Sequence, residues 1–164
     1  MRNTSFAEMH CSLAQSLEVM GDWWTPLILR DLYLGLDRFD QLVTDLGISR
    51  NLLTARLAAL VESGVITRTP YQDNPVRSAY ALTEAGRDLI PILIALTAWG
   101  DRWFTPDGGP PIRFTHETCG HRTTATVSCS ACGNPLAADD VTPSPGPGGR
   151  TAPGTALIAT VVAG

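Results

Sequence analysis

The sequence of 164 residues contains no lysine, and all 12 of its basic residues are arginine. Arginine carries a planar fork of donors that suits phosphate and guanine, although a composition bias of the source organism explains the missing lysine equally well. No apolar run approaches the roughly 18 residues that a membrane-spanning helix needs. The first residues also lack the apolar block of a secretion signal. We therefore expect a cytoplasmic protein without a membrane partner.

The chain has only four cysteines, and in a cytoplasmic protein these are not expected to form structural disulfides. No group of residues resembles a nucleophile with its base and an orienting partner, so we predict that the protein is not an enzyme. An enzyme acting at the cysteine cluster is the weakest of the function classes that we considered.

Acidic residues outnumber basic ones, and the formal net charge is −4. This balance argues mildly against a nucleic-acid partner. The distribution argues for one, because residues 1–47 carry three arginines and seven acids, whereas residues 48–80 carry four arginines and two acids. The positive charge is thus concentrated in about one fifth of the chain, and local charge decides attraction to DNA.

The basic segment, residues 48–80, opens with a predicted helix whose two faces differ in character. Ser49 follows Gly47-Ile48 and is a typical N-cap residue. Leucines 53, 57 and 60 share one face at helical spacing. The exposed face carries small or hydrogen-bonding side chains, which suit a groove of DNA. The candidate DNA-binding residues are Ser49, Arg50, Asn51, Thr54, Arg56 and, from a later turn, Arg77.

Each of these residue types matches a known contact. Arg50 is placed for guanine and Asn51 for adenine or a phosphate, and a good bidentate pair discriminates by about 1–3 kcal/mol. Thr54 suits a thymine methyl group or a phosphate, and Arg77 suits the minor groove or the backbone. Arg56 has two open roles, a backbone contact or an intramolecular ion pair.

The neighbouring segments predict a winged helix-turn-helix, which is mainly α with a small β-wing. Hydrophobic spacing predicts helices over 11–21, 24–34, 38–46, 50–62 and 84–104, with Leu13, Leu17 and Met20 facing inward on the first. Two strands are predicted at 65–69 and 78–82, with a turn over 72–77. Residues 89–96 of the last helix are apolar nearly all round, so this helix is either a core helix or a dimer interface. Pro91 should bend it or need local compensation.

Residues 11–104 resemble HxlR-type transcriptional regulators, which are relatives of the MarR-like winged-helix proteins. The matching pieces are Cys11-Ser12-Leu13, Gly21-Asp22-Trp23-Trp24-Thr25-Pro26-Leu27-Ile28-Leu29, Arg38-Phe39-Asp40-Gln41-Leu42, Gly47-Ile48-Ser49, Leu52-Leu53-Thr54-Ala55-Arg56-Leu57, Tyr71, Pro75, Arg77, Tyr80, Leu82-Thr83-Glu84-Ala85-Gly86 and Ala98-Trp99-Gly100-Asp101-Arg102-Trp103. The resemblance implies a homodimer, built from the first and last helices, on a roughly palindromic operator. Trp23, Ala55 and Ala58 depart from the family pattern, so operator contacts are expected to be fewer.

Cys11 matches the position of a cysteine through which several family members sense electrophiles or oxidants. A thiol at a helix N-terminus can become more reactive, because the helix end favours the thiolate, and His10 could assist. The alternative is a small, buried hydrophobic side chain.

The segment after the last helix carries two copies of a ligand-x2-ligand-Gly pattern. These are His116 to Gly120 and Cys129 to Gly133, and such knuckles pair around tetrahedral zinc. We predict a structural zinc ion held by His116, Cys119, Cys129 and Cys132, with His121 as an alternative ligand and residues 123–128 as a connecting strand. Free thiols or a Cys129–Cys132 redox pair remain open.

The sequence thus predicts a winged helix-turn-helix over 1–104, a linker over 105–111, a small zinc-ribbon-like β segment over 112–140 and a low-complexity, disordered tail over 141–164. The predicted function is a homodimeric, sequence-specific DNA-binding transcriptional regulator, most simply a repressor of a nearby gene, with an unknown effector. The alternative function is a protein-interaction module that uses the zinc-ribbon-like segment.

Overall fold

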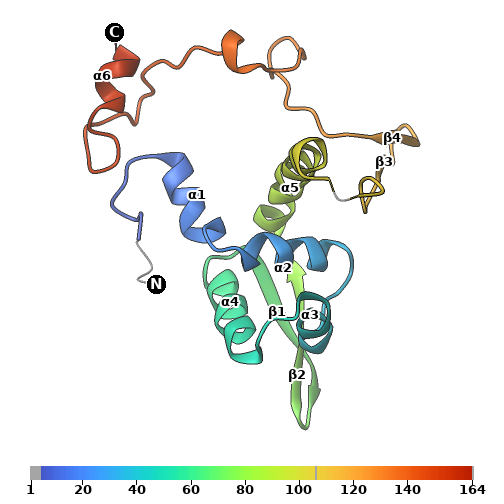
Figure 1. Cartoon of the computed structure of the whole chain (residues 1–164). Helices are drawn as coiled ribbons and strands as arrows, with labels where there is room; N and C mark the ends of the chain where they lie inside the picture. Colours follow the sequence, from blue (N-terminus) through green and yellow to red (C-terminus); the bar gives the residue numbers. More distant parts are fainter. Residues whose placement is uncertain (1–4, 106, 164) are drawn as a thin grey trace.

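The structure is a computed structural model that describes residues 5–105 and 107–163. Its helices are α1 (Ser12–Met20), α2 (Trp24–Tyr33), α3 (Phe39–Leu46), α4 (Arg50–Glu62), α5 (Glu84–Trp103) and α6 (Ile158–Ala163). Its strands are β1 (Ile66–Asp73), β2 (Val76–Leu82), β3 (Phe114–His116) and β4 (His121–Thr123). The order confirms the predicted helix-turn-helix with a two-stranded wing (Figure 1).

The helix-turn-helix is formed by α3, a tight turn and α4. Gly47 ends α3 with a φ of 62°, a left-handed conformation that glycine adopts without a steric cost. Ser49 then caps α4, because its Oγ accepts a hydrogen bond from the N–H of Leu52 at 3.3 Å. Ile48 lies between the two and is buried, which fixes the angle at which α4 leaves the turn.

One hydrophobic core lies behind α4. Leu53, Leu57 and Leu60 are buried on a single face of that helix, as predicted. They pack with buried residues of α2, α3, the start of the wing and α5, which are Ile28, Leu29, Leu32, Leu42, Val65, Ile66, Tyr80, Ile90 and Leu93. The core therefore holds α4 by its leucine face and leaves the opposite face to solvent.

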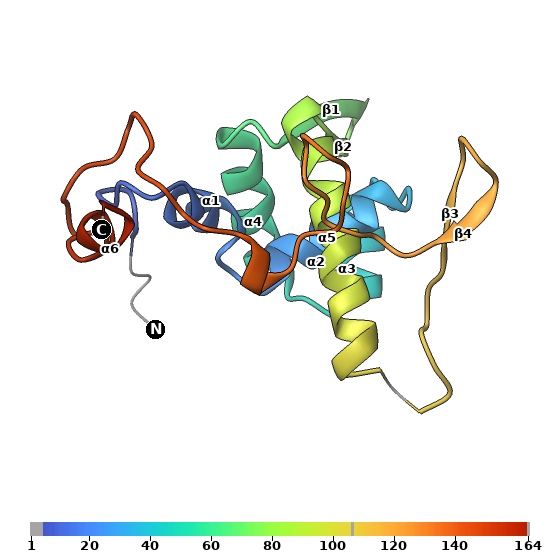
Figure 2. The ribbon, with the colours of Figure 1, turned by 90° about the horizontal axis from the view of Figure 1, so that it is seen from above.

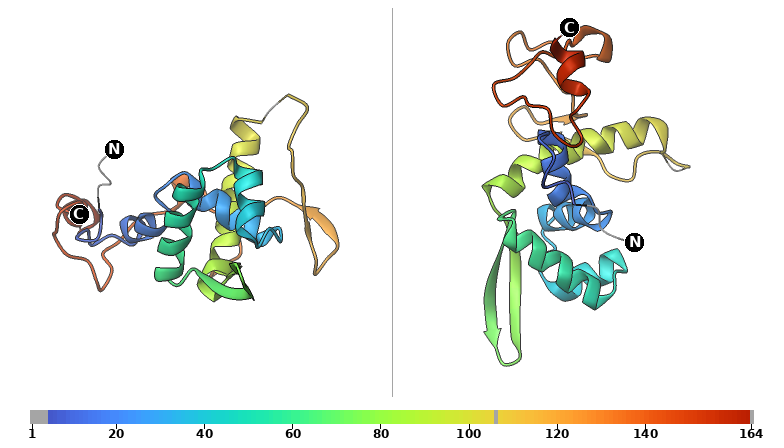
Figure 3. Two further views of the ribbon diagram at one scale, coloured as in Figure 1. Left: turned by 90° about the horizontal axis from the view of Figure 1, so that it is seen from below. Right: turned by 90° about the vertical axis from the view of Figure 1, so that its left-hand side faces the viewer.

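The wing is an antiparallel pair in which Ile66 faces Leu82 and Asp73 faces Val76. Both strands are longer than predicted, and the connecting turn shrinks to Asn74-Pro75. In the right panel of Figure 3 the wing extends well beyond the helices, beside α4. Its base is attached to α5 through Thr83, whose Oγ1 donates to the carbonyl of Gly64 at 2.7 Å and accepts from the N–H of Gly86.

The first and last helices each leave an apolar face uncovered. On α1 only Ala14 is buried, and Leu13 is 69% exposed, so the prediction that Leu13 and Leu17 face inward is wrong within one chain. The long α5 buries Ile90 and Leu93 and leaves other large side chains in solvent, namely Ile92, Leu96, Trp99 and Trp103. Leu13 and Leu17 stay exposed because α1 reaches the core only through Val19 and Met20 at its C-terminal end.

After α5 the chain turns back, and Ile112 and Phe114 line a cleft of about 270 Å³ together with α2 and α5. The β3–β4 hairpin follows, and the remaining chain crosses the molecule to α6, which lies near α1 (Figures 1 and 2). The predicted strand over 123–128 is wrong, because strand β4 ends at Thr123. In the described part of the chain no helix combines the length and the apolar character that a membrane span needs.

Candidate nucleic-acid interface

The exposed face of α4 presents the side chains that the sequence predicts for DNA. Ser49, Arg50, Asn51 and Thr54 are all exposed in the first turn and a half. The Thr54 hydroxyl donates to the carbonyl of Arg50 at 2.8 Å, which leaves its methyl group pointing outward from the helix. The face is therefore short and polar and carries no large apolar side chain, which suits a helix in a major groove.

Arg50 is held in a fixed position by α3. Its Nη1 lies 2.8 Å from Oδ1 of Asp40, and its guanidinium lies 4.9 Å from the centre of the Phe39 ring. Both side chains of the ion pair are 64% exposed, so the pair is screened by water and worth at most about 1 kcal/mol. Arg50 is thus oriented by a weak pair that a stronger partner can displace at small cost.

A groove of about 810 Å³ runs between α4, which we call the reading helix, and the wing. Arginines line it from both sides, and they are Arg38, Arg50, Arg68 and Arg77. Arg77 comes from the wing, so the structure brings it to the same groove as Arg50 and Thr54. The two acids in the lining are Asp37 and Asp40.

Two of these arginines were missed by the sequence analysis. Arg38 precedes α3 and stacks on Tyr71 of the wing, with 4.6 Å from the guanidinium carbon to the ring centre. Arg68 lies on β1 and donates to the hydroxyl of Ser78 at 2.9 Å. Tyr80 N–H also bonds to the Asp37 carbonyl at 2.8 Å, which brings the start of α3 beside β2. The available signal was the cluster of arginines around the turn, but only this pairing shows which of them share a groove.

Arg56 takes the second of its two predicted roles. It points away from the groove, and its Nε lies 3.5 Å from Oδ2 of Asp22. The same carboxylate accepts from the N–H of Trp24 at 2.7 Å and from the hydroxyl of Thr25 at 2.7 Å, so it caps α2. Arg56 therefore connects α4 to the start of α2 rather than facing the DNA side.

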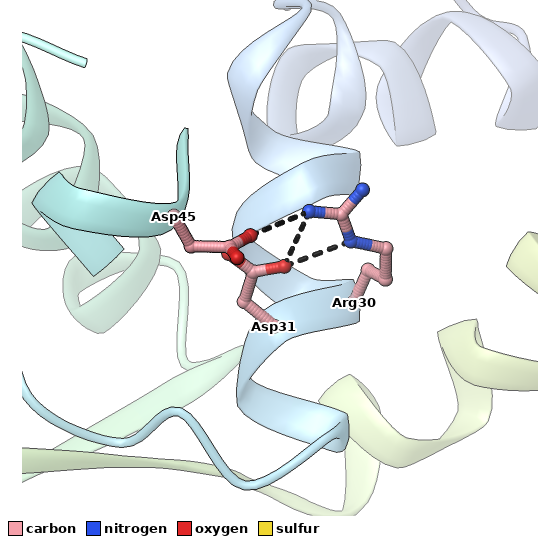
Figure 4. A network of polar contacts seen from close by, with 3 residues as sticks. All are labelled: Arg30, Asp31 and Asp45. Atoms are coloured by element: carbon pink, nitrogen blue, oxygen red, sulfur yellow. Dashed lines mark hydrogen bonds and ion pairs between the residues drawn. The ribbon is translucent and has the colours of Figure 1, made fainter. Parts of the chain in front are cut away.

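A second polar network fixes α2 against α3. Arg30 contacts Asp31 at 2.6 Å and Asp45 at 3.1 Å (Figure 4). Asp31 is fully buried, and this burial raises the pKa of its carboxyl above the ordinary value, against the opposing effect of Arg30. The network thus links α2, which carries Arg30 and Asp31, with α3, which carries Asp45 and also Asp40.

Cys11 lies at the N-cap position of α1 and is partly exposed. Its side chain makes no capping hydrogen bond to the helix. The residue therefore sits where the sequence analysis placed it, on the helix whose apolar face is uncovered.

The predicted zinc ligands lie in two separate turns. His116 and Cys119 belong to the first, where Nδ1 and Sγ are 3.4 Å apart, and His121 pairs with His116 across the hairpin. In the second turn, backbone N–H groups of Cys132 and Ala131 lower the pKa of the Cys129 thiol. Within residues 5–105 and 107–163, no three such ligands come together.

The HxlR-like helix-turn-helix family model matches residues 19–108. The uncharacterized HTH-type transcriptional regulator Rv3095 of Mycobacterium tuberculosis is 46% identical over 137 residues, which make up 84% of this chain and 87% of that protein. The uncharacterized HTH-type transcriptional regulator sll1512 of Synechocystis is 37% identical over 94 residues, covering 57% of this chain and 70% of that protein.

Two solved structures extend this comparison. The candidate transcription factor PA1607 is 37% identical with a TM-score of 0.73, and the match covers 84% of this chain and 96% of that one. The redox regulator HypR in its oxidized form is 30% identical with a TM-score of 0.52, covering 56% of this chain and 96% of that one. With its reading helix, wing and family match, this chain belongs to the HxlR-like helix-turn-helix family and is a transcriptional regulator.

Proposed function

We propose that the protein represses a nearby gene by binding, as a homodimer, to a roughly palindromic operator. The observation that carries the proposal is the groove between α4 and the wing, which gathers Arg38, Arg50, Arg68 and Arg77 beside a polar reading face. The N-terminal turn of α4 enters the major groove, and the wing reaches the adjacent backbone. A dimer bound over a promoter excludes the polymerase from it.

The uncovered apolar faces support the dimer. Leu13 and Leu17 on α1, together with Trp99 and Trp103 on α5, form exposed apolar surface of the kind that marks protein interfaces. Pairing these faces would place two α4 helices in successive turns of the major groove, about 34–36 Å apart. A homodimer accounts for this surface and for operator symmetry together.

The test uses labelled DNA from the intergenic region upstream of the gene that encodes this protein. Binding should be specific, should saturate at two chains per operator, and should weaken steeply with salt, because each neutralised phosphate contributes about 0.9 to the slope of log K against log salt. Binding that ignores salt, or an Arg50→Ala, Arg77→Ala variant that binds this fragment as well as the wild type, would refute the proposal. Salt-independent capture of a protein would favour the interaction-module alternative instead.

The effector belongs to the same proposal. Cys11 is the N-cap residue of α1, the helix that carries Leu13 and Leu17 of the face assigned to the dimer, so its oxidation or alkylation would change the packing that sets the spacing of the two reading helices. HypR, a relative with the same fold, is named a redox regulator. Diamide would take two electrons and two protons from a pair of thiols and leave a disulfide, and a small ligand at the same interface is the alternative.

A further inference from the structure

The segment beyond the winged helix contains two tight turns of the same construction. In the first, the carbonyl of His116 accepts from the N–H of Gly120 at 2.8 Å, and in the second the carbonyl of Cys129 accepts from the N–H of Gly133 at 2.8 Å. Both closures join residue i to residue i+4. A metal-ligand residue therefore occupies the first and fourth positions of each turn, which are His116, Cys119, Cys129 and Cys132.

The closing glycines agree in conformation as well. Gly120 has a φ of 69° and Gly133 a φ of 75°, and both are left-handed. This conformation favours glycine because a side chain there would be strained. The two turns therefore share their ligand positions, their closing hydrogen bond and their final residue conformation, although their other residues differ.

Each turn is the tip of a short hairpin. The first hairpin is β3–β4, where Phe114 pairs with Thr123. In the second, Ser128 pairs with Pro135, and the N–H of Leu136 bonds to the carbonyl of Val127 at 2.9 Å. Two ligand-bearing hairpin tips that follow each other in the chain are the arrangement from which four-ligand zinc ribbons are assembled.

The first tip already has the spacing that a metal needs. Zinc binds thiolate sulfur at about 2.3 Å and imidazole nitrogen at about 2.0–2.1 Å, so two such ligands on one tetrahedral ion lie about 3.6 Å apart. The observed distance from Nδ1 of His116 to Sγ of Cys119 is 3.4 Å. The separation of these two atoms is therefore within about 0.2 Å of the separation that one shared ion requires.

We infer that His116, Cys119, Cys129 and Cys132 bind one structural zinc ion, and that the metal draws the two hairpin tips together. Residues 124–127 connect the hairpins without regular secondary structure and allow the second tip to swing toward the first. The thiols release their protons when they bind. Four protein ligands leave no position for water, so the ion supports the fold of the segment and does no chemistry.

His116 is assigned in preference to His121 because of its position in the turn. His116 occupies the place that Cys129 occupies in the other turn, and its ring already contacts Cys119. His121 follows the closing glycine and begins β4. The two histidines are Cα partners across the hairpin, so replacing each of them separately is a sharp test of which one binds the ion.

The test measures zinc per chain in the reduced full-length protein after dialysis against a weak chelator. Wild type and Cys11→Ser should retain one zinc per chain, whereas Cys119→Ser, Cys129→Ser, Cys132→Ser and His116→Gln should lose it, and His121→Gln should keep it. Absence of zinc from the wild type, or retention in the three cysteine variants, overturns the site. Loss in His121→Gln with retention in His116→Gln overturns the ligand assignment.

Protease sensitivity gives a second readout that does not depend on metal analysis. The chain has no lysine, so trypsin can cut the segment only after Arg113 and Arg122 and the following tail only after Arg150. Arg122 lies on β4, between the two tips. Zinc should slow cleavage after Arg122 about tenfold or more, by stabilising the closed segment, and leave cleavage after Arg150 unchanged. Equal rates after Arg122 with and without zinc, or a Cys129–Cys132 disulfide in the purified protein, would contradict the inference.

Discussion

Replacing either of two arginines on α4 by alanine should have opposite consequences: one variant should lose operator affinity and the other should lose stability. Arg50 faces the groove and Arg56 faces Asp22, although only six positions separate them on α4. If the groove is the DNA surface, Arg50→Ala should weaken operator binding with little effect on folding. Arg56→Ala should destabilise the fold and leave the affinity of the folded protein almost unchanged.

The magnitudes follow from the contacts. A bidentate contact to a base is worth about 1–3 kcal/mol, and breaking the exposed pair with Asp40 costs up to about 1 kcal/mol. For a net loss in the middle of the resulting range, about 1–2 kcal/mol, Arg50→Ala should raise the operator Kd about 5- to 30-fold. Arg56 and Asp22 side chains are 30% and 19% exposed. Because that pair is partly buried, its loss should cost on the order of 1–2 kcal/mol and lower Tm by about 5–10 °C.

The Asp40 carboxylate supplies a control for the role of Arg50. Asp40→Asn removes the competitor for the guanidinium and should tighten operator binding up to about fivefold. In an Arg50→Ala background the same change should have a much smaller effect, since the competition no longer exists. Fluorescence anisotropy measures the four Kd values, and thermal unfolding measures the stabilities. A large loss of affinity in Arg56→Ala with none in Arg50→Ala would refute this orientation of α4.

Three further predictions follow from other contacts. Gly86→Ala should lower Tm, because a Cβ there overlaps the carbonyl oxygen of Val65, whereas Gly100→Ala meets nothing within 4 Å and should stabilise α5 by about 0.5–1 kcal/mol. Burial raises the pKa of the Asp31 carboxyl, so ionisation costs more in the folded state and its contribution to stability falls as pH rises above 3.8. Asp31→Asn should therefore gain stability relative to wild type between pH 4 and 7 in urea unfolding, and a gap independent of pH would contradict this. Cys11→Ser should bind the operator normally and lose any response to diamide, and an unchanged response would exclude Cys11 as the sensor.

The elements of the winged helix were predictable because each one is encoded locally. Gly47 and Ser49 mark the turn and the cap, and the leucine spacing after them defines the buried face. These signals act over a few residues, so pattern and structure agree. The wing was predicted too short, because the pairing of Thr69 with Ala79 and Asp73 with Val76 depends on the partner strand and not on local composition.

The composition of the groove could not be predicted in the same way. Arg38 and Tyr71 are 33 positions apart in sequence but stack at 4.6 Å, since α3 and the wing meet only after the core has formed. The ion pair of Arg56 could not be predicted either, because helical spacing alone does not reveal that Asp22 lies beside the face of α4 that carries Arg56. Likewise the exposed Leu13 follows the helical pattern of a core residue, and only packing shows that nothing in the same chain covers it.

The acids of the groove partly neutralise its arginines. Arg50 pairs with Asp40, and Arg38 lies 3.8 Å from Asp37. In the part of the chain that the structure describes, Arg68 and Arg77 make no such pair with a carboxylate within 4.0 Å. Attraction to any phosphate backbone then depends mainly on these two. Arg50 leaves Asp40 only for a base or phosphate contact worth more than the exposed pair, so Asp40 lowers operator affinity by at most about 1 kcal/mol and keeps Arg50 off more weakly placed phosphates.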